Sequence, residues 1–229
     1  MDRGIWAIGY ELPDKIKSEY LDWFHHVHIP EKLSRPGYAW AAHYELQQSG
    51  LSGRGNGYLA LFGGITAHTF LNPSPGQLAQ RQSVETRRMV GTRQQSAACI
   101  LAEEIRVDGP DVAQRGPGMT PGPVIQMGNY NAANVAVEDD LGAWYAQQRL
   151  PLLAGLPGCI GVRKMLATVG AYKHAILYEF VSLKLREKHF APHEAEAHDP
   201  DTWMGQVRPQ LTHAPRSPAV GRRIWPVVE

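Results

Sequence analysis

The strongest constraint on this chain is one short pattern that occurs twice. Residues 22–40 read DWFHHVHIPEKLSRPGYAW, and residues 143–161 read AWYAQQRLPLLAGLPGCIG. At a constant spacing of 121 residues, the landmarks that coincide are Trp23, Pro30, Pro36 and Gly37 in the first copy and Trp144, Pro151, Pro157 and Gly158 in the second. The first copy carries three histidines that the second lacks, so the two copies differ in their chemistry.

A segment rich in glycine and proline separates the copies. Residues 108–123 read DGPDVAQRGPGMTPGP, a composition that disfavours both helix and strand. We therefore expect a first repeat over 1–110, a linker over 111–122 and a second repeat over 123–229. Each repeat has the size of a small domain.

Hydrophobic periodicity predicts the same order of elements in both repeats. The expected strands cover 4–10, 37–47, 57–63 and 97–107 in the first repeat and 124–131, 158–168, 171–181 and 219–228 in the second. The expected helices end at Pro30 and Pro151, and further helical regions cover 75–90 and part of 183–211. GRGNG at 53–57 fits a hairpin loop. The order β-α-β-β-α-β, written twice, predicts an α+β protein of two ferredoxin-like repeats.

Such a repeat covers only one face of its sheet with helices, and the other apolar face needs a partner. The second repeat can supply that partner within the same chain. We therefore expect the two sheets to pack face to face as an intramolecular dimeric α/β barrel. A homodimer of this pseudo-dimeric chain remains a further option.

Composition excludes several classes of function. The 23 basic and 22 acidic residues leave a net charge of +1, which gives no footprint for nucleic acid. The sequence holds no apolar run long enough for a membrane span, and its N-terminus lacks a signal-peptide core. The two cysteines have no metal-type spacing and predict reduced thiols in a cytoplasmic protein. Ten histidines are the main compositional hint of chemistry.

A helix ending in W…HxP, followed by PG at the start of a strand, resembles the EthD-like branch of the dimeric α/β-barrel superfamily. The resemblance covers both repeats. It implies a pocket between the helices and the sheet of each repeat. It also implies an activity among isomerases, polyketide cyclases and cofactor-free monooxygenases, and other branches of the superfamily bind haem.

The resemblance also suggests catalytic residues in the first repeat. In the methylisomerase-like pattern a histidine precedes the PG glycine by nine residues, and His28 has this spacing to Gly37. At the expected helix C-terminus the dipole would favour a charged imidazole, suited to proton transfer. The tyrosine that the family places four residues after this glycine is Ala41 here, which weakens any tyrosine-assisted mechanism. His43 and Glu45 share the strand face of Ala41, so His43 is a second catalytic candidate and Glu45 its partner.

The remaining candidates bind substrate or surround it. They are Trp23, Trp40 and His25 in the first repeat, with Arg149 in the position of His28 and His174 in the second repeat. Arg149 cannot act as a base but can hold an anion. HFAPHEAEAHD at 189–199 lacks metalloprotease spacing, and its prolines favour a solvated loop. We expect no metal site.

The sequence thus predicts a cofactor-independent lyase, isomerase or cyclase that acts by acid–base chemistry on a hydrophobic, aromatic or polyketide-like molecule. A cofactor-free or haem-binding monooxygenase and a non-catalytic binding protein stay open as alternatives. The three histidines favour the first repeat as the reactive one, with the second kept as a sheet partner.

Overall fold

The computed structural model describes residues 2–49 and 57–228. The strands are β1 Gly4–Glu11, β2 Tyr38–Ser49, β3 Tyr58–Gly64, β4 Gln94–Asp108, β5 Val124–Ala132, β6 Cys159–Val169, β7 His174–Phe180, β8 Leu211–His213 and β9 Ala219–Trp225. The α-helices are α1 Asp14–Trp23, α2 Ile29–Leu33, α3 Pro75–Gln80, α4 Val84–Val90, α5 Val135–Trp144, α6 Leu150–Ala154, α7 Leu183–Leu185, α8 Ala191–Ala195 and α9 Trp203–Val207. Most of the expected hairpin loop at 53–57 lies outside the described residues. None of the described helices is both long and apolar enough to cross a bilayer.

Eight strands form one closed antiparallel barrel. The strand order is β7-β6-β4-β1-β3-β2-β9-β5, and β5 pairs again with β7 to close the ring. Among the described residues, the short strand β8 pairs with Tyr130–Ala132 at the end of β5. The two halves of the chain are joined at two seams, β4 with β6 and β2 with β9. We expected two sheets packed face to face; their edges are also hydrogen-bonded to each other, which satisfies backbone groups that an open edge would leave unpaired.

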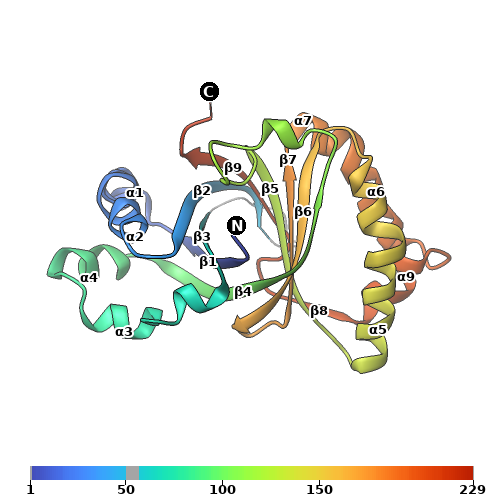
Figure 1. The fold of residues 1–229 in the computed structure, drawn as a ribbon, viewed down its shortest axis with the longest axis horizontal. Helices are drawn as coiled ribbons and strands as arrows, with labels where there is room; N and C mark the ends of the chain where they lie inside the picture. The colour runs from blue at the N-terminus through green and yellow to red at the C-terminus, as the bar shows by residue number, and fades with distance from the viewer. Residues whose placement is uncertain (1, 50–56, 229) are drawn as a thin grey trace.

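The helices lie outside the barrel on two opposite flanks. Figure 1 shows α1 to α4 on one flank and α5, α6 and α9 on the other. Three apolar cores result: one inside the barrel, and one between each set of helices and its strands. Side chains that alternate along each strand fill the inner and the outer cores in turn.

Pro30 does not end its helix, contrary to the prediction. A π-helical segment, Phe24–His28, follows α1, and α2 continues to Leu33. The Ile29 N–H donates to the Phe24 carbonyl five residues back, and Pro30, which has no N–H, occupies the first turn of α2, where that group is not needed. The same arrangement recurs at Tyr145–Arg149 before Pro151 and at Arg186–Phe190 before Pro192. The stretch expected as a solvated loop at 189–199 is therefore largely helical.

One end of the barrel interior holds a buried network of charges. Arg163 donates to Asp2 at 2.7 Å and to Glu179 at 3.3 Å, and all three side chains are fully buried. Trp40 donates its Nε1–H to Asp2 at 2.6 Å, and the Gly122 N–H donates to Glu179 at 3.0 Å. Burial alone would raise the pKa of Asp2, but the charge of Arg163 and the Trp40 bond outweigh it and lower that pKa. Paired in this way, the charges can remain ionised inside the protein.

Candidate functional site

His28 lies in the core between the first-half helices and the sheet. Its side chain is 4% exposed and stacks on the Trp23 ring at 4.6 Å between centroids. Burial, together with the nearby charges of Lys32 and Arg93, lowers the pKa of His28 to about 2. Because the helix runs on to Leu33, no helix end acts on His28. The expected charged, helix-terminal imidazole is therefore wrong: His28 is neutral and packed.

His43 lies at the centre of a hydrogen-bonded row. It shares a hydrogen bond of 2.9 Å with the Tyr10 hydroxyl and one of 2.8 Å with His25, which is half-buried. Burial lowers the pKa of His43 well below its usual value and that of His25 to about 4. Glu45 does not contact His43 in this row; it accepts a hydrogen bond from Lys17 at 3.0 Å. The row is thus uncharged at neutral pH.

Trp40 lies on the opposite side of the sheet from these histidines. Trp40 faces the barrel interior together with Ala42 and Tyr44 and meets Asp2 there, and a β-bulge separates it from Tyr38. Tyr38 instead packs on the helix side against Phe70, with ring centroids 5.0 Å apart. The expectation that Trp40 lines a site with His28 and Trp23 is therefore wrong.

The two helix–sheet cores differ in how completely they are filled. β1 pairs with β3 in the same register as β5 pairs with β7, so Trp6 corresponds to Gln126 and Ile8 to Gly128. Trp6 and Ile8 are buried in the first-half core. Their smaller counterparts leave a cavity of about 60 Å³ in the second half. The hollow site lies in the half whose copy of the repeated motif lacks histidines.

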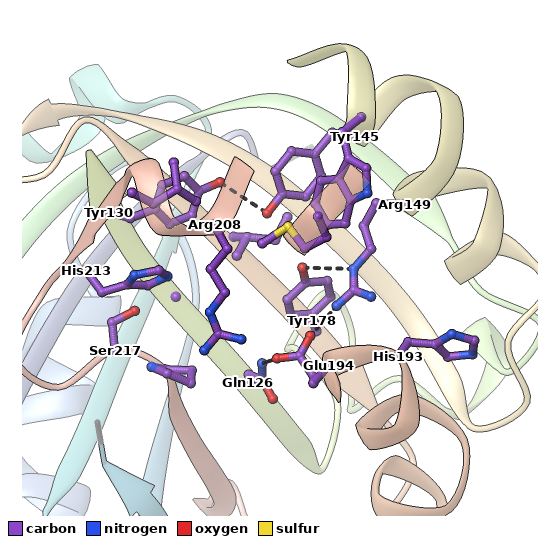
Figure 2. A pocket seen from close by; sticks show the side chains of 16 residues that line it. Gln126, Tyr130, Tyr145, Arg149, Tyr178, His193, Glu194, Arg208, His213 and Ser217 are labelled. Atoms are coloured by element: carbon purple, nitrogen blue, oxygen red, sulfur yellow. Dashed lines mark hydrogen bonds and ion pairs between the residues drawn. The ribbon is translucent and has the colours of Figure 1, made fainter. Parts of the chain in front are cut away.

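Arg149 and Glu194 form the charged wall of this second-half cavity. Arg149, 4% exposed, is ion-paired with Glu194 of α8 and donates to the Tyr178 hydroxyl at 3.4 Å. Gln126 on β5 donates its side-chain amide to Glu194 at 3.0 Å. Figure 2 shows these side chains converging from the helices and the sheet. Burial lowers the pKa of Arg149, but Tyr178 and Glu194 raise that pKa by more than burial lowers it. The guanidinium therefore stays charged.

Two tyrosines and a histidine form the opposite wall. Tyr130 donates its hydroxyl to Tyr145 at 3.1 Å, and burial raises the pKa of both phenols. His213 on β8 lies 5.8 Å from the Tyr130 ring. Burial, followed by the charge of Arg208, lowers the pKa of His213 below 6.5. The wall therefore offers protonated phenols beside a neutral imidazole.

His174 lies behind this wall. Its ring stacks on Tyr130 at 5.5 Å, and its Nε2 is 3.1 Å from a carboxylate oxygen of Glu138. Of the second-half residues that the sequence singled out, Arg149 lines the cavity and His174 supports a lining residue.

Glu194, Arg208 and His213 were not among the residues expected at the site. Glu194 was assigned to a solvated loop, although FAP at 190–192 repeats the spacing of HIP and RLP after a π-helical segment. This third occurrence of a proline two residues after the end of such a segment could have indicated a helix at Glu194. For His213, on a strand of three residues, we find no sequence signal. Among the described residues no group of three or more histidine, cysteine or acidic side chains is placed to hold a metal ion.

No known sequence family matches this chain, and no curated protein matches it in sequence. Solved structures do match its fold. An anthrone oxidase-like protein has a TM-score of 0.60 at 10% identity, over 97% of this chain and 92% of that chain. Chlorite dismutase from Candidatus Nitrospira defluvii, in complex with imidazole, has a TM-score of 0.51 at 9% identity, over 97% of this chain and 91% of that chain.

A haem-binding protein from Thermus thermophilus has a TM-score of 0.50 at 12% identity, over 97% of this chain and 91% of that chain. These likenesses span nearly the whole length of each protein, although the identities are low. Together with the closed ring of eight strands and the two helical flanks, they show that the chain has the dimeric α/β-barrel fold.

Proposed function

We propose that this protein is a small-molecule enzyme whose reaction takes place in the second-half cavity. The observation that carries the proposal is the convergence there of a buried cation, a carboxylate, three phenols and a neutral imidazole around one hollow. Polar groups that converge in a cavity are the usual mark of a reactive site. This assigns the chemistry to the opposite half from the one that the three motif histidines, His25, His26 and His28, favour.

The charges of the cavity favour a small, acidic aromatic substrate. Arg149 is flanked by the rings of Trp144, Tyr178 and Phe190, with its guanidinium carbon 4.7 to 5.5 Å from the ring centroids. Arg208 brings a second positive charge to the wall. Guanidinium groups beside aromatic faces suit a planar anionic group such as a phenolate oxygen, an enolate or a carboxylate. Since the cavity measures about 60 Å³ and a benzene ring needs about 150 Å³, the cavity accommodates this reacting group, and the ring that bears it would lie outside the cavity.

His213 is our candidate for the proton carrier. It is neutral at pH 7 because burial and Arg208 lower its pKa, so it can accept a proton from a substrate carbon or hydroxyl. Arg208 would stabilise the anion that forms, and the Tyr130–Tyr145 pair would donate hydrogen bonds to its oxygen. Such a transfer is the common step of isomerases, lyases and cyclases. We propose this reaction class.

A cofactor-free monooxygenase is the second candidate. The likeness in fold to the anthrone oxidase-like protein favours it. A deprotonated phenol in the same cavity would be the species that reacts with oxygen. Consumption of dissolved oxygen during turnover distinguishes this candidate from proton transfer alone.

Haem does not fit the second-half cavity. Small-molecule pockets measure roughly 300–1,000 Å³, whereas this cavity measures about 60 Å³. A porphyrin would have to displace the Arg149–Glu194 ion pair. His193, an axial ligand by residue type alone, is held by Glu196 at 2.9 Å, and Figure 2 shows it apart from the other side chains. We therefore assign haem no part in the proposed reaction.

We also propose that the two halves are tandem ferredoxin-like repeats. In the first half β1 lies between β3 and β4, and β2 lies beside β3. In the second half β5 lies between β7 and β9, and β6 lies beside β7. The matched register of β1–β3 and β5–β7 supports the same reading.

The reaction site can be tested by a pair of substitutions. Small phenols, enols and aromatic acids are screened for turnover by the full chain. We expect His213→Gln to lower kcat by roughly 100-fold or more, the usual scale for a lost acid or base. His28→Phe, in the filled half, is expected to retain activity. The opposite outcome, with His28→Phe inactive and His213→Gln active, would assign the reaction to the first half.

A further inference from the structure

The barrel interior is hollow at the end opposite the Asp2–Arg163 network. A cavity of about 330 Å³ opens there, which we call the barrel chamber. Its lining comes from both halves of the chain: Ala7, Gly9, Leu46 and Leu59 in the first, and Met127 and Ala219 in the second. It shares only Ser217 with the lining of the second-half cavity. The barrel chamber is thus a separate compartment.

Small side chains keep the barrel chamber open. Ala7 and Gly9 point inward from β1, whereas Ile5, two residues earlier, packs in the barrel core. A Cβ added to Gly9 would meet no atom within 4 Å. Glycine within a strand often marks a place where another molecule approaches the backbone closely.

The described walls of the barrel chamber are largely apolar, and two of their polar atoms, the Tyr58 hydroxyl and one guanidinium nitrogen of Arg216, have no hydrogen-bond partner among the described residues. Asn129 contacts the Cys99 sulfur at 3.9 Å. Arg216 donates to Glu11 at 2.8 Å and to Gln95 at 3.1 Å, which balances its charge. Burial raises the pKa of Cys99 to about 11, so its thiol stays uncharged. Arg216 is the one charged side chain among the described lining residues, and its charge is already paired with Glu11.

Volume sets the size of the ligand. An apolar cavity of about 150 Å³ holds a benzene ring. The barrel chamber, at about 330 Å³, is roughly twice that size and falls within the usual range for ligand pockets. We propose that the barrel chamber is a binding site for an uncharged aromatic molecule of two or three rings, separate from the reaction site.

The proposal can be tested with N-phenyl-1-naphthylamine, an uncharged three-ring probe that fluoresces in apolar surroundings. We expect saturable binding to the full chain at one site per molecule. Gly9→Leu places a side chain in the barrel chamber, and its Cβ would meet no atom within 4 Å, so we expect its melting temperature to change little while its affinity for the probe falls at least tenfold. Gly142→Leu is the matched control, because Gly142 on α5 also has open space at its Cβ but lines neither cavity.

A second measurement needs no variant. Cys99 lines the barrel chamber and Cys159 does not, so bound probe should slow alkylation of Cys99 by N-ethylmaleimide at least several-fold; the reaction is followed over a long incubation, because the raised pKa of Cys99 leaves little reactive thiolate. Mass spectrometry of the labelled peptides reports each thiol. Binding with no protection of Cys99, undiminished binding by Gly9→Leu, or no binding at all would each overturn the proposal.

Discussion

Burial, rather than hydrogen bonding alone, decides how the first-half histidines respond to pH. His28 and His43 lie inside an aromatic core, and both stay neutral in the folded protein because water cannot solvate their charge. In the unfolded chain the same side chains titrate near pH 6.5. Below that pH the two histidines bind protons in the unfolded state but not in the folded state. Their contribution to the free energy of unfolding is therefore fully present above pH 6.5 and declines as the pH falls.

His28→Phe should therefore flatten the dependence of stability on pH. Phenylalanine can stack on Trp23 in place of the imidazole, and it does not titrate. Between pH 7.5 and pH 5 the wild type should lose about 2 kcal/mol more unfolding free energy than the variant, as expected for one histidine protonated only when unfolded. Urea unfolding at the two pH values measures this difference. His26→Gln, at an exposed position, is the control, and equal losses in wild type and His28→Phe would contradict the prediction.

Strands β2 and β3 pack closely at Gly63, which has no side chain. Gly63 on β3 lies under the indole of Trp40 on β2, and a Cβ at Gly63 would be 2.0 Å from Trp40 Cε2. The close approach lets Trp40 reach Asp2 inside the barrel. The glycine thus links the packing of two strands to the buried charge network.

Gly63→Ala should destabilise the protein because the ring has to move. Overpacking of this kind costs about 1–3 kcal/mol, and loss of the Trp40–Asp2 bond adds to it. Gly9→Ala is the matched strand control, because its new Cβ would meet no atom within 4 Å. Thermal unfolding of both variants checks the prediction, which fails if Gly63→Ala melts at the wild-type temperature.

Elements could be predicted from the sequence where one local pattern determines them. Alternating apolar residues located the eight barrel strands to within a few residues. The bulge before Trp40 could not be predicted, because a one-residue shift depends on the partner strand. The helix beyond Pro30 was missed because the π-helical segment before it relieves the usual effect of proline.

The candidate site was harder to predict for a related reason. A cavity depends on which side chains face one another in three dimensions. Gly128 leaves space in the second half at the position that Ile8 fills in the first. The two positions can be recognised as equivalent only once the strand register is known. Histidines are conspicuous in a sequence, whereas an empty space is not.

The whole molecule depends on its two seams. Within the first half alone, β2 and β4 would each have an unpaired edge, and the inward side chains of β1 would face water. Exposed edges of this length promote association with other chains. The two halves therefore stabilise each other.

Residues 1–110 expressed alone should not form a stable monomer. We expect them to aggregate or to form dimers that restore the missing seams. Light scattering after size exclusion measures the mass, and circular dichroism follows melting. A soluble monomer that melts cooperatively near the temperature of the full chain would show that the seams are dispensable.

The seam between β2 and β9 also has a consequence for protein synthesis. β2 ends at Ser49, and its outer neighbour begins only at Ala219. A ribosome adds about 5–20 residues per second, so the free edge of β2 emerges roughly 10–30 s before its partner exists. For that interval the nascent chain carries an open sheet edge, and the ring can close only after β9 has been made. A chaperone bound near the exit tunnel would protect this chain more than one whose strands pair in the order in which they are made.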